Sequence, residues 1–378
     1  MQQVEGRERR STISSLKSIL LHPALLTLVV LALLQWAVIA GAGGDPLALA
    51  RLGTRFSQGD PHGSEGYDGQ FVYYIARNPN PAVVAPLLDI PAYRYQRILL
   101  PLLARLLSLG NVQALPWVLA ILGLLAQAAG TWAVAELLAG WGVSRRYALV
   151  YGLWAGFVLS VRLDLPEPLA FGLAAGAILA TERGRPAVGW ALYALAVFAK
   201  ETALAFVVAQ VLADLAARRW RPALALAGLA GLPFALFQGW LWWVFGQVGV
   251  ASGGAMATPF ERIPFMGLLR IGAYSPAYLA AMLVVFGPAV ILPSLWGIGA
   301  SLKKLLSDSR NVIVLGLFIH ALAIPFLPFS TFRETGGLLR FTCGLVLSIL
   351  LFAGRYKIGR VLNYSFFWIV LNVFLLKS

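Results

Sequence analysis

Long apolar stretches alternate with short polar or basic segments along most of this chain. A helix needs about 20 apolar residues to cross a bilayer. The first stretch covers residues 20–43, and the others lie near 111–139, 147–163, 168–182, 187–200, 202–217, 222–247, 276–300, 311–329, 341–354 and 362–376. The pattern predicts an all-α polytopic membrane protein with about 11 transmembrane or membrane-embedded helices. The stretches 168–182, 187–200 and 202–217 are short, so we expect tilted or half-buried helices there.

One region departs from this alternation. Residues 44–110, between the first and second apolar stretches, are rich in polar and turn-forming residues and include five acidic residues. We expect a large first loop there, with short amphipathic helices. The chain is then a single membrane domain over 1–378, with a basic leader at 1–19, this loop at 44–110 and a helix bundle at 111–378.

Composition supports a chain whose solvent is mostly lipid. Of its 378 residues, 59% are hydrophobic and only 12% are charged, whereas soluble domains carry about 25% charged residues. Cys343 is the only cysteine, which excludes a disulfide scaffold. The chain holds 21 Phe, 12 Trp and 12 Tyr, an aromatic content that excludes a solvated disordered coil.

The net charge of +14 gives the orientation. In a soluble protein it would suggest nucleic acid as a partner. In a polytopic membrane protein, lysine and arginine gather instead in short cytoplasmic loops. With the N-terminus in the cytoplasm, 17 of the 30 Lys and Arg residues fall on that side. We therefore expect a multi-pass protein of the cell membrane, no nucleic-acid partner, and the large first loop outside the cytoplasm.

Asp68 is the sharpest candidate for chemistry in that loop. It lies in the segment Gly66–Ala76 and precedes about nine residues of helical pattern, which two prolines close. Phe71, Val72 and Ile75 are expected to face the membrane. Asp68 either caps this helix by accepting from its first amides, or is a carboxylate that takes a proton from an acceptor hydroxyl.

A second acidic group occupies the turn at 162–168, between two apolar stretches. Asp164 and Glu167 stand there beside two prolines. In the structural interpretation Asp164 pairs with Arg162 and Glu167 stabilises the first turn of a helix. In the functional one, the two carboxylates support the same site as Asp68.

Four arginines on the same side of the membrane are candidates for binding an anion. Arg94 and Arg97 are three residues apart and share a helix face, while Arg333 and Arg340 flank two glycines, with Arg340 opening a helix. Guanidinium groups match phosphate oxygens bidentately. The alternatives are an interfacial belt of aromatic and cationic residues for the first pair and contacts with lipid headgroups for the second.

The remaining polar features carry less chemistry. Lys200 and Glu201 are expected to form an internally satisfied pair. The sequence has no zinc-ligand spacing, no P-loop and no dinucleotide-type glycine motif.

Four short motifs follow one another between residues 15 and 215. They are Tyr67-Asp68-Gly69-Gln70-Phe71-Val72-Tyr73-Tyr74-Ile75-Ala76, Leu100-Pro101-Leu102-Leu103-Ala104-Arg105-Leu106, Pro166-Glu167-Pro168-Leu169 with Glu182-Arg183-Gly184-Arg185, and Ala199-Lys200-Glu201-Thr202-Ala203-Leu204. Their order resembles the GT-C superfamily of integral-membrane glycosyltransferases. It is most similar to the branch related to the GPI-anchor mannosyltransferase that adds the second mannose. That branch has Trp where this chain has Tyr67.

The resemblance implies a GT-C-like fold and an inverting transfer of a sugar, as by a mannosyltransferase. The donor would be a polyprenyl-phosphate-linked sugar and the acceptor a glycan, lipid or protein outside the cytoplasm. Asp68 would be the base, and Arg94, Arg97, Arg333 and Arg340 would hold the phosphate. No cofactor is required, although Asp164 or Glu167 could support a divalent metal.

Two other classes of function fit the same composition. Gly- and Pro-rich helices with buried charges also occur in transporters and flippases, although no inverted repeat is visible and the charges gather on one side. A scaffold of the cell envelope without chemistry is the other class, and there Asp68 would be dispensable.

Overall fold

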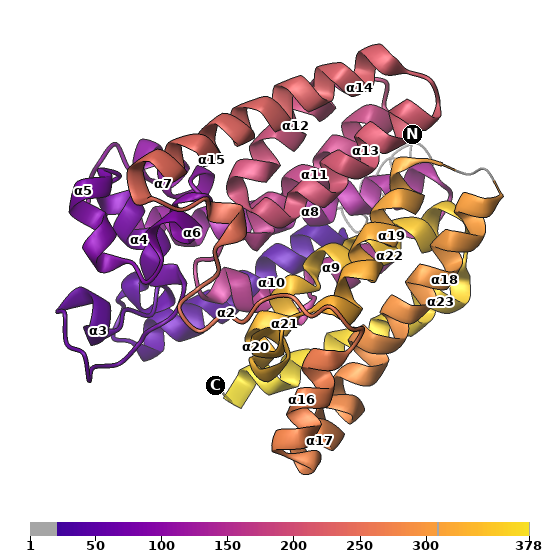
Figure 1. Ribbon diagram of the computed structural model, residues 1–378. Helices are drawn as coiled ribbons and strands as arrows, with labels where there is room; N and C mark the ends of the chain where they lie inside the picture. Colours follow the sequence, from indigo (N-terminus) through magenta and orange to yellow (C-terminus); the bar gives the residue numbers. More distant parts are fainter. Residues whose placement is uncertain (1–20, 308–309, 378) are drawn as a thin grey trace, which may run out of the picture.

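The computed structural model describes residues 21–307 and 310–377, and throughout these residues the ordered elements are helices (Figure 1). The basic leader at 1–19 lies outside the described residues. In chain order the elements are α2 (Pro23–Gly41), η1 (Pro46–Leu49), α3 (Thr54–Ser57), α4 (Gly69–Arg77), α5 (Pro81–Val84), η2 (Ala85–Leu87), α6 (Pro91–Tyr95), α7 (Leu99–Leu107), α8 (Leu115–Gly140), η3 (Arg145–Tyr147), α9 (Ala148–Gly152), α10 (Ala155–Arg162), α11 (Glu167–Glu182), α12 (Pro186–Ala199), η4 (Glu201–Ala203), α13 (Leu204–Ala216), α14 (Trp220–Leu226), η5 (Ala227–Gly231), α15 (Leu232–Phe245), η6 (Gly249–Ala251), α16 (Met266–Tyr274), α17 (Pro276–Phe286), η7 (Gly287–Ile291), α18 (Leu292–Leu306), α19 (Val312–Ala323), η8 (Ile324–Phe326), α20 (Phe329–Arg333), α21 (Thr335–Phe341), α22 (Cys343–Arg355), α23 (Gly359–Ser365) and η9 (Phe366–Lys377).

Five helices of the described chain are long and apolar enough to cross a membrane, which confirms the membrane character predicted from the sequence. They are Pro23–Gly41, Leu115–Gly140, Trp220–Phe245, Pro276–Leu306 and Thr335–Arg355. Each corresponds to one of the eleven predicted stretches. The other stretches form shorter helices, and 147–163 is divided between α9 and α10. The number of crossings therefore stays a prediction.

Two of the long helices, Trp220–Phe245 and Pro276–Leu306, each contain a π-helical turn directly before an internal proline-containing pair. The turns η5 and η7 each end directly before a Leu-Pro pair, Leu232-Pro233 and Leu292-Pro293. Proline has no amide hydrogen to donate to the preceding turn. The wider π turn accommodates that missing bond, so each helix continues through its proline.

Small residues let the central helices approach closely. Helix α11 packs against both α8 and α12, and α2 packs along α8. A Cβ atom added to Gly130 on α8 would lie 2.9 Å from the Cα atom of Gly172 on α11. Because larger side chains would separate these backbones, the glycines and alanines of α8 and α11 define the centre of the bundle.

The predicted first loop is a compact cluster of short helices, α3 to α7, beside α8 and α15 (Figure 1). Phe71, Val72 and Ile75 of α4 are buried in a core within the protein. The expectation that they face the membrane was wrong. Helix α4 is surrounded because it packs against α7 and α8, which also form part of this core.

Candidate functional site

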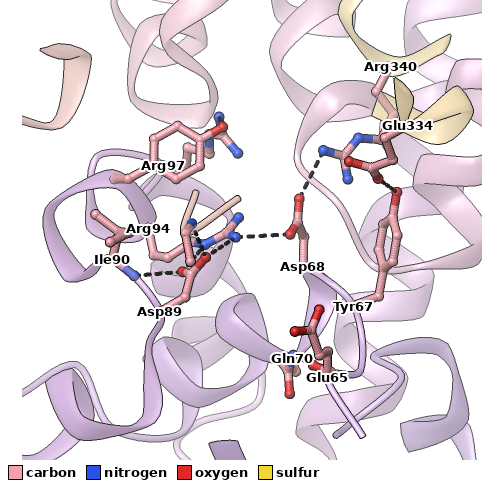
Figure 2. A network of polar contacts seen from close by, with 12 residues as sticks. Glu65, Tyr67, Asp68, Gln70, Asp89, Ile90, Arg94, Arg97, Glu334 and Arg340 are labelled. Atoms are coloured by element: carbon pink, nitrogen blue, oxygen red, sulfur yellow. Dashed lines mark hydrogen bonds and ion pairs between the residues drawn. The ribbon is translucent and has the colours of Figure 1, made fainter. Parts of the chain in front are cut away.

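A cavity of about 1140 Å³ lies between three parts of the described chain. The loop cluster from α3 to α6 forms one wall, and α20 and α21 form another. The segment from Val250 to Phe260, between α15 and α16, lines a third side. Asp68 lies among these walls, between side chains of the first and second (Figure 2).

Asp68 bridges two arginines. It occupies the N-cap position of α4, but its side chain makes no capping hydrogen bond. Oδ1 lies 3.0 Å from Arg94 Nη2 and Oδ2 lies 2.9 Å from Arg340 Nη2, and the Asp68 side chain is 25% exposed (Figure 2). The interpretation of Asp68 as a helix cap is wrong, because both carboxylate oxygens face cations instead of the free amides of α4.

Arg94 is held from its other side by Asp89. Arg94 Nε and Nη2 donate to the two carboxylate oxygens of Asp89 at 2.7 and 2.8 Å. Asp89 also accepts from the amide of Ala255, in the segment that lines the cavity. The guanidinium carbon of Arg94 stacks 4.3 Å from the centre of the Phe71 ring. Arg94 therefore keeps a bidentate partner even without Asp68.

Arg97 has a bidentate partner of its own. Its Nε and Nη2 atoms donate to Glu201 at 2.9 and 2.6 Å, and Nη2 also lies 2.6 Å from the hydroxyl of Tyr93. Lys200, the neighbour of Glu201, instead donates to Glu167 Oε1 at 2.6 Å. The expected Lys200–Glu201 pair is wrong, since each residue pairs with a different part of the chain.

Arg340 is buried and is the least satisfied of these arginines. It lies in the last turn of α21, and the helix continues into α22 almost at once, so the prediction that it opens a helix is wrong. Besides Asp68, its Nε atom lies 3.4 Å from Glu167 Oε1. Neither Nε nor Nη1 makes a hydrogen bond to any described residue. Its guanidinium carbon lies 5.3 Å from the centre of the Tyr67 ring.

Two close contacts set the position of Asp68 relative to Arg340. The backbone of Gly69 lies directly on the carbonyl of Leu163, where any Cβ atom would collide. This contact fixes the start of α4 against the turn that leads to Glu167. Trp154, the N-cap residue of α10, donates through Nε1 to the carbonyl of Leu339, 2.9 Å away, and so links α21 to the helix that precedes this turn.

The structure brings together most of the candidates from the sequence. Arg94, Arg97, Arg333 and Arg340 all line the cavity with Asp68, which confirms that they border one space. A smaller cavity beside it is lined by both Asp68 and Glu167. Arg333 is exposed, and its guanidinium lies over the ring of Phe329.

Asp164 is placed differently, because it lines neither of these cavities. Asp164 follows Leu163, the C-cap residue of α10, and has a φ of 52°, and the amide of Leu165 donates to the carbonyl of Ser160. This is the hydrogen bond of a Schellman motif, in which the left-handed residue ends the helix. Arg162 donates to the carbonyl of Leu375, 3.0 Å away. The geometry therefore gives Asp164 a part in ending α10, away from the cavity.

The charges hold the carboxylates of the cavity in their ionised form. Burial raises the pKa of Asp68, but Arg94 and Arg340 lower it by more, so its pKa lies well below the ordinary value. Burial also raises the pKa of Glu201, but Arg97 lowers it by more, and the resulting pKa is about 2. Neither carboxylate takes up a proton near neutral pH while its arginines stay in place.

Several contributors to the cavity escaped the sequence reasoning. Asp89 has no motif around it, and no pattern in the sequence singles out the segment 250–260. Tyr67 stands where the branch that the chain resembles has Trp, and the sequence assigns it no contact; in the structure it stacks on Arg340 and donates to Glu334 at 2.9 Å. Within 21–307 and 310–377, no three His, Cys, Asp or Glu residues are arranged to hold a metal ion.

Comparison with known proteins adds no relative to this description. No family model, no curated protein and no solved structure matches the chain.

Proposed function

We propose that the protein is a membrane glycosyltransferase that transfers a sugar from a polyprenyl-phosphate carrier to an acceptor hydroxyl with inversion. The observation that carries this proposal is Asp68, a carboxylate between two buried arginines on the wall of a large cavity. Burying arginines is costly, so a cavity lined by three buried arginines, Arg94, Arg97 and Arg340, is suited to an anion. The ordered motifs that resemble the GT-C superfamily support the same function.

The reaction assigns one role to each kind of group. Asp68 accepts the proton of the acceptor hydroxyl while the oxygen of that hydroxyl forms a bond to the anomeric carbon. The bond between that carbon and the phosphate oxygen breaks, and the phosphate leaves with the electron pair. Arg340 and its neighbours stabilise the charge that develops on the phosphate. The phosphate is itself a good leaving group, so no step is routed through a metal.

The orientation proposed from the basic loops places this cavity outside the cytoplasm. Glu167 and Arg183 are at opposite ends of the 16-residue helix α11. That separation is about 24 Å. Arg183, Arg145 and Arg146 then lie at the cytoplasmic end, and the cavity opens at the other surface, where a lipid-linked donor would present its phosphate.

The test is transfer from a panel of polyprenyl-phosphate hexoses by the purified full-length protein, with membrane lipid extract as the source of acceptors. Asp68→Asn should reduce transfer about a hundredfold or more, because an amide cannot accept the proton. Glu136→Gln is the matched control, since Glu136 also bridges two arginines but lies far from the cavity. Near-normal transfer by Asp68→Asn would contradict the proposal. Movement of an intact lipid or solute without any transfer product would favour a transporter.

A further inference from the structure

We infer that Asp68 and the phosphate of the lipid carrier compete for Arg340, so that binding of the phosphate releases the carboxylate that acts as the base. This inference rests on the proposed function and adds an order of events to it. In the resting protein Asp68 occupies the place of the anion. The argument starts from the balance of charges around the cavity.

Eight charged side chains in and beside the cavity are paired with one another, four cations with four anions. The cations are Arg94, Arg97, Lys200 and Arg340, and the anions are Asp68, Asp89, Glu167 and Glu201. The set is neutral, so a negatively charged phosphate finds none of these four cations without a carboxylate already beside it. Arg333 also lines the cavity but is exposed, so solvent screens its charge. Unless one carboxylate gives way, the phosphate meets repulsion in a poorly solvated place.

Asp68 is the carboxylate that is easiest to displace. Asp89 and Glu201 each hold one arginine through two hydrogen bonds. Glu167 is 1% exposed and is bound by Lys200. Asp68 makes one contact to each of two arginines, and its side chain is the most exposed of the four, at 25%. It can leave its cations at the lowest cost in lost hydrogen bonds.

Arg340 is the cation that gains from the exchange. Arg94 and Arg97 keep their bidentate partners if Asp68 moves away, whereas Arg340 would keep only the longer 3.4 Å contact of Nε with Glu167 Oε1. Its Nε and Nη1 atoms are buried and have no hydrogen-bond partner among the described residues. A phosphate presents several oxygens to a guanidinium and can satisfy these donors bidentately, which the single oxygen of Asp68 does not.

The exchange changes the chemistry of Asp68 in the direction that catalysis needs. While the arginines hold it, its pKa lies far below the ordinary value, and a carboxylate with such a low pKa is a weak base. When the phosphate engages Arg340, Asp68 loses a cation and gains an anionic neighbour, and both changes raise its pKa. During transfer the phosphate then gains one negative charge as Asp68 gains one proton, so the net charge of the cavity stays constant.

Binding of farnesyl phosphate to the purified full-length protein tests the competition without any transfer. Farnesol and inorganic phosphate are measured in parallel. The inference requires farnesyl phosphate to bind more tightly than either, and equal affinity for inorganic phosphate would overturn the assignment to a lipid phosphate. Asp68→Asn should tighten the binding of farnesyl phosphate about tenfold or more, because the carboxylate that competes with the phosphate for Arg340 is gone. Unchanged or weaker binding would overturn the inference.

Glu334→Gln is the matched control for charge. Glu334 lines the same cavity and accepts from Tyr67, and no ion pair joins it to a described arginine. Its replacement removes the same charge without freeing an arginine, so the affinity should rise less than about threefold. An equal gain in both variants would show general repulsion and not competition.

Two further variants guard the result. In the double variant Asp68→Asn with Arg340→Gln the gain should disappear, because the contested cation is absent. A gain that persists would overturn the role of Arg340. Asp68→Ser serves as a second replacement should the asparagine variant fail to fold.

Loss of transfer in Asp68→Asn with unchanged phosphate binding would keep the proposed function and reject the competition. Tighter phosphate binding by Asp68→Asn, with no sugar transfer by the native protein or any variant, would keep the competition and reject the proposed function.

Discussion

Two carboxylates in this protein each bridge a pair of arginines, at opposite ends of the bundle. Asp68 lies between Arg94 and Arg340, and Glu136 lies between Arg145 and Arg183. The contacts are alike, at 2.7–3.0 Å. The arginines differ, because those around Asp68 are 8% and 10% exposed, whereas those around Glu136 are 51% and 46% exposed.

The difference shows that geometry alone does not identify a site. Water and salt screen the arginines around Glu136, and exposed ion pairs of this kind contribute about 0–1 kcal/mol. The arginines around Asp68 have lost most of their hydration, so each depends on its protein partners. The same arrangement therefore carries a small desolvation penalty around Glu136 and a large one around Asp68. The arrangement around Asp68 borders a cavity, as expected when a ligand is to take part in the balance of charge.

The largest effect should come from Arg340→Gln. It leaves Asp68 and Glu167 without a shared cation in a buried place, and we expect a loss of about 3–5 kcal/mol in unfolding free energy. Arg183→Gln, its counterpart beside Glu136, should cost less than about 1 kcal/mol. Chemical unfolding of the two variants in the same detergent measures both. Equal losses would mean that burial does not separate the two networks.

Acid should act next most strongly, through Glu201. Its pKa is about 2 in the folded protein, against an ordinary value of 4.5. A depressed pKa stabilises the fold above the ordinary value, and this contribution is lost as the pH falls from 4.5 towards 2. We expect about 2–3 kcal/mol to disappear across that interval. Glu201→Gln should unfold with a weaker dependence on pH there, and an unchanged dependence would contradict the shift.

Arg340→Lys should have an intermediate effect on use of the donor. The positive charge remains, but the planar pair of donors is lost, so we expect transfer at limiting donor to fall about tenfold. Saturating donor should recover part of this loss, because the variant weakens binding of the phosphate more than the transfer of the proton. Initial rates at several donor concentrations separate the two contributions. A loss that persists in full at saturation would argue against a role in binding.

The smallest effect is predicted for Glu136→Gln. It removes the exposed bridge, and we expect a change below about 1 kcal/mol in stability. Raising the salt concentration should erase this difference, since surface ion pairs are screened over about 8–10 Å at moderate ionic strength. Thermal unfolding at low and high salt gives the measurement. A larger, salt-independent loss would place Glu136 in the same class as Asp68.

The sequence predicted those parts of the structure that local rules determine. The spanning helices follow from runs of apolar residues, and the nine residues of α4 follow from Asp68 at the start and the prolines beyond its end. The four arginines are candidates because guanidinium groups match phosphate oxygens and because these residues fall on the same side of the membrane as Asp68. Those reasons do not depend on knowing which residues they meet.

The pairing of charges could not be predicted, because it depends on contacts far apart in the chain. Arg97 meets Glu201 across 104 positions, and Lys200 meets Glu167 across 33. Lys200 and Glu201 are adjacent, which favoured a local pair, but the extended backbone of Lys200 separates α12 from η4. Burial of Phe71 on α4 was missed for a similar reason, since an apolar helix face looks the same whether lipid or protein covers it.

Asp89 also holds the segment that lines the third side of the cavity. Between α15 and α16 the chain runs for 20 residues, 246–265, with a single 3-10 turn of three residues. Along the cavity its hydrogen bonds include those from Ala255 to Asp89 and from Thr258 to Ser330. Segments of this kind open in microseconds to milliseconds. Because Asp89 fastens the segment and also orients Arg94, opening would loosen an arginine at the same moment. Under the proposed function, the residence time of a bound lipid phosphate would therefore be coupled to how often Asp89 releases the segment.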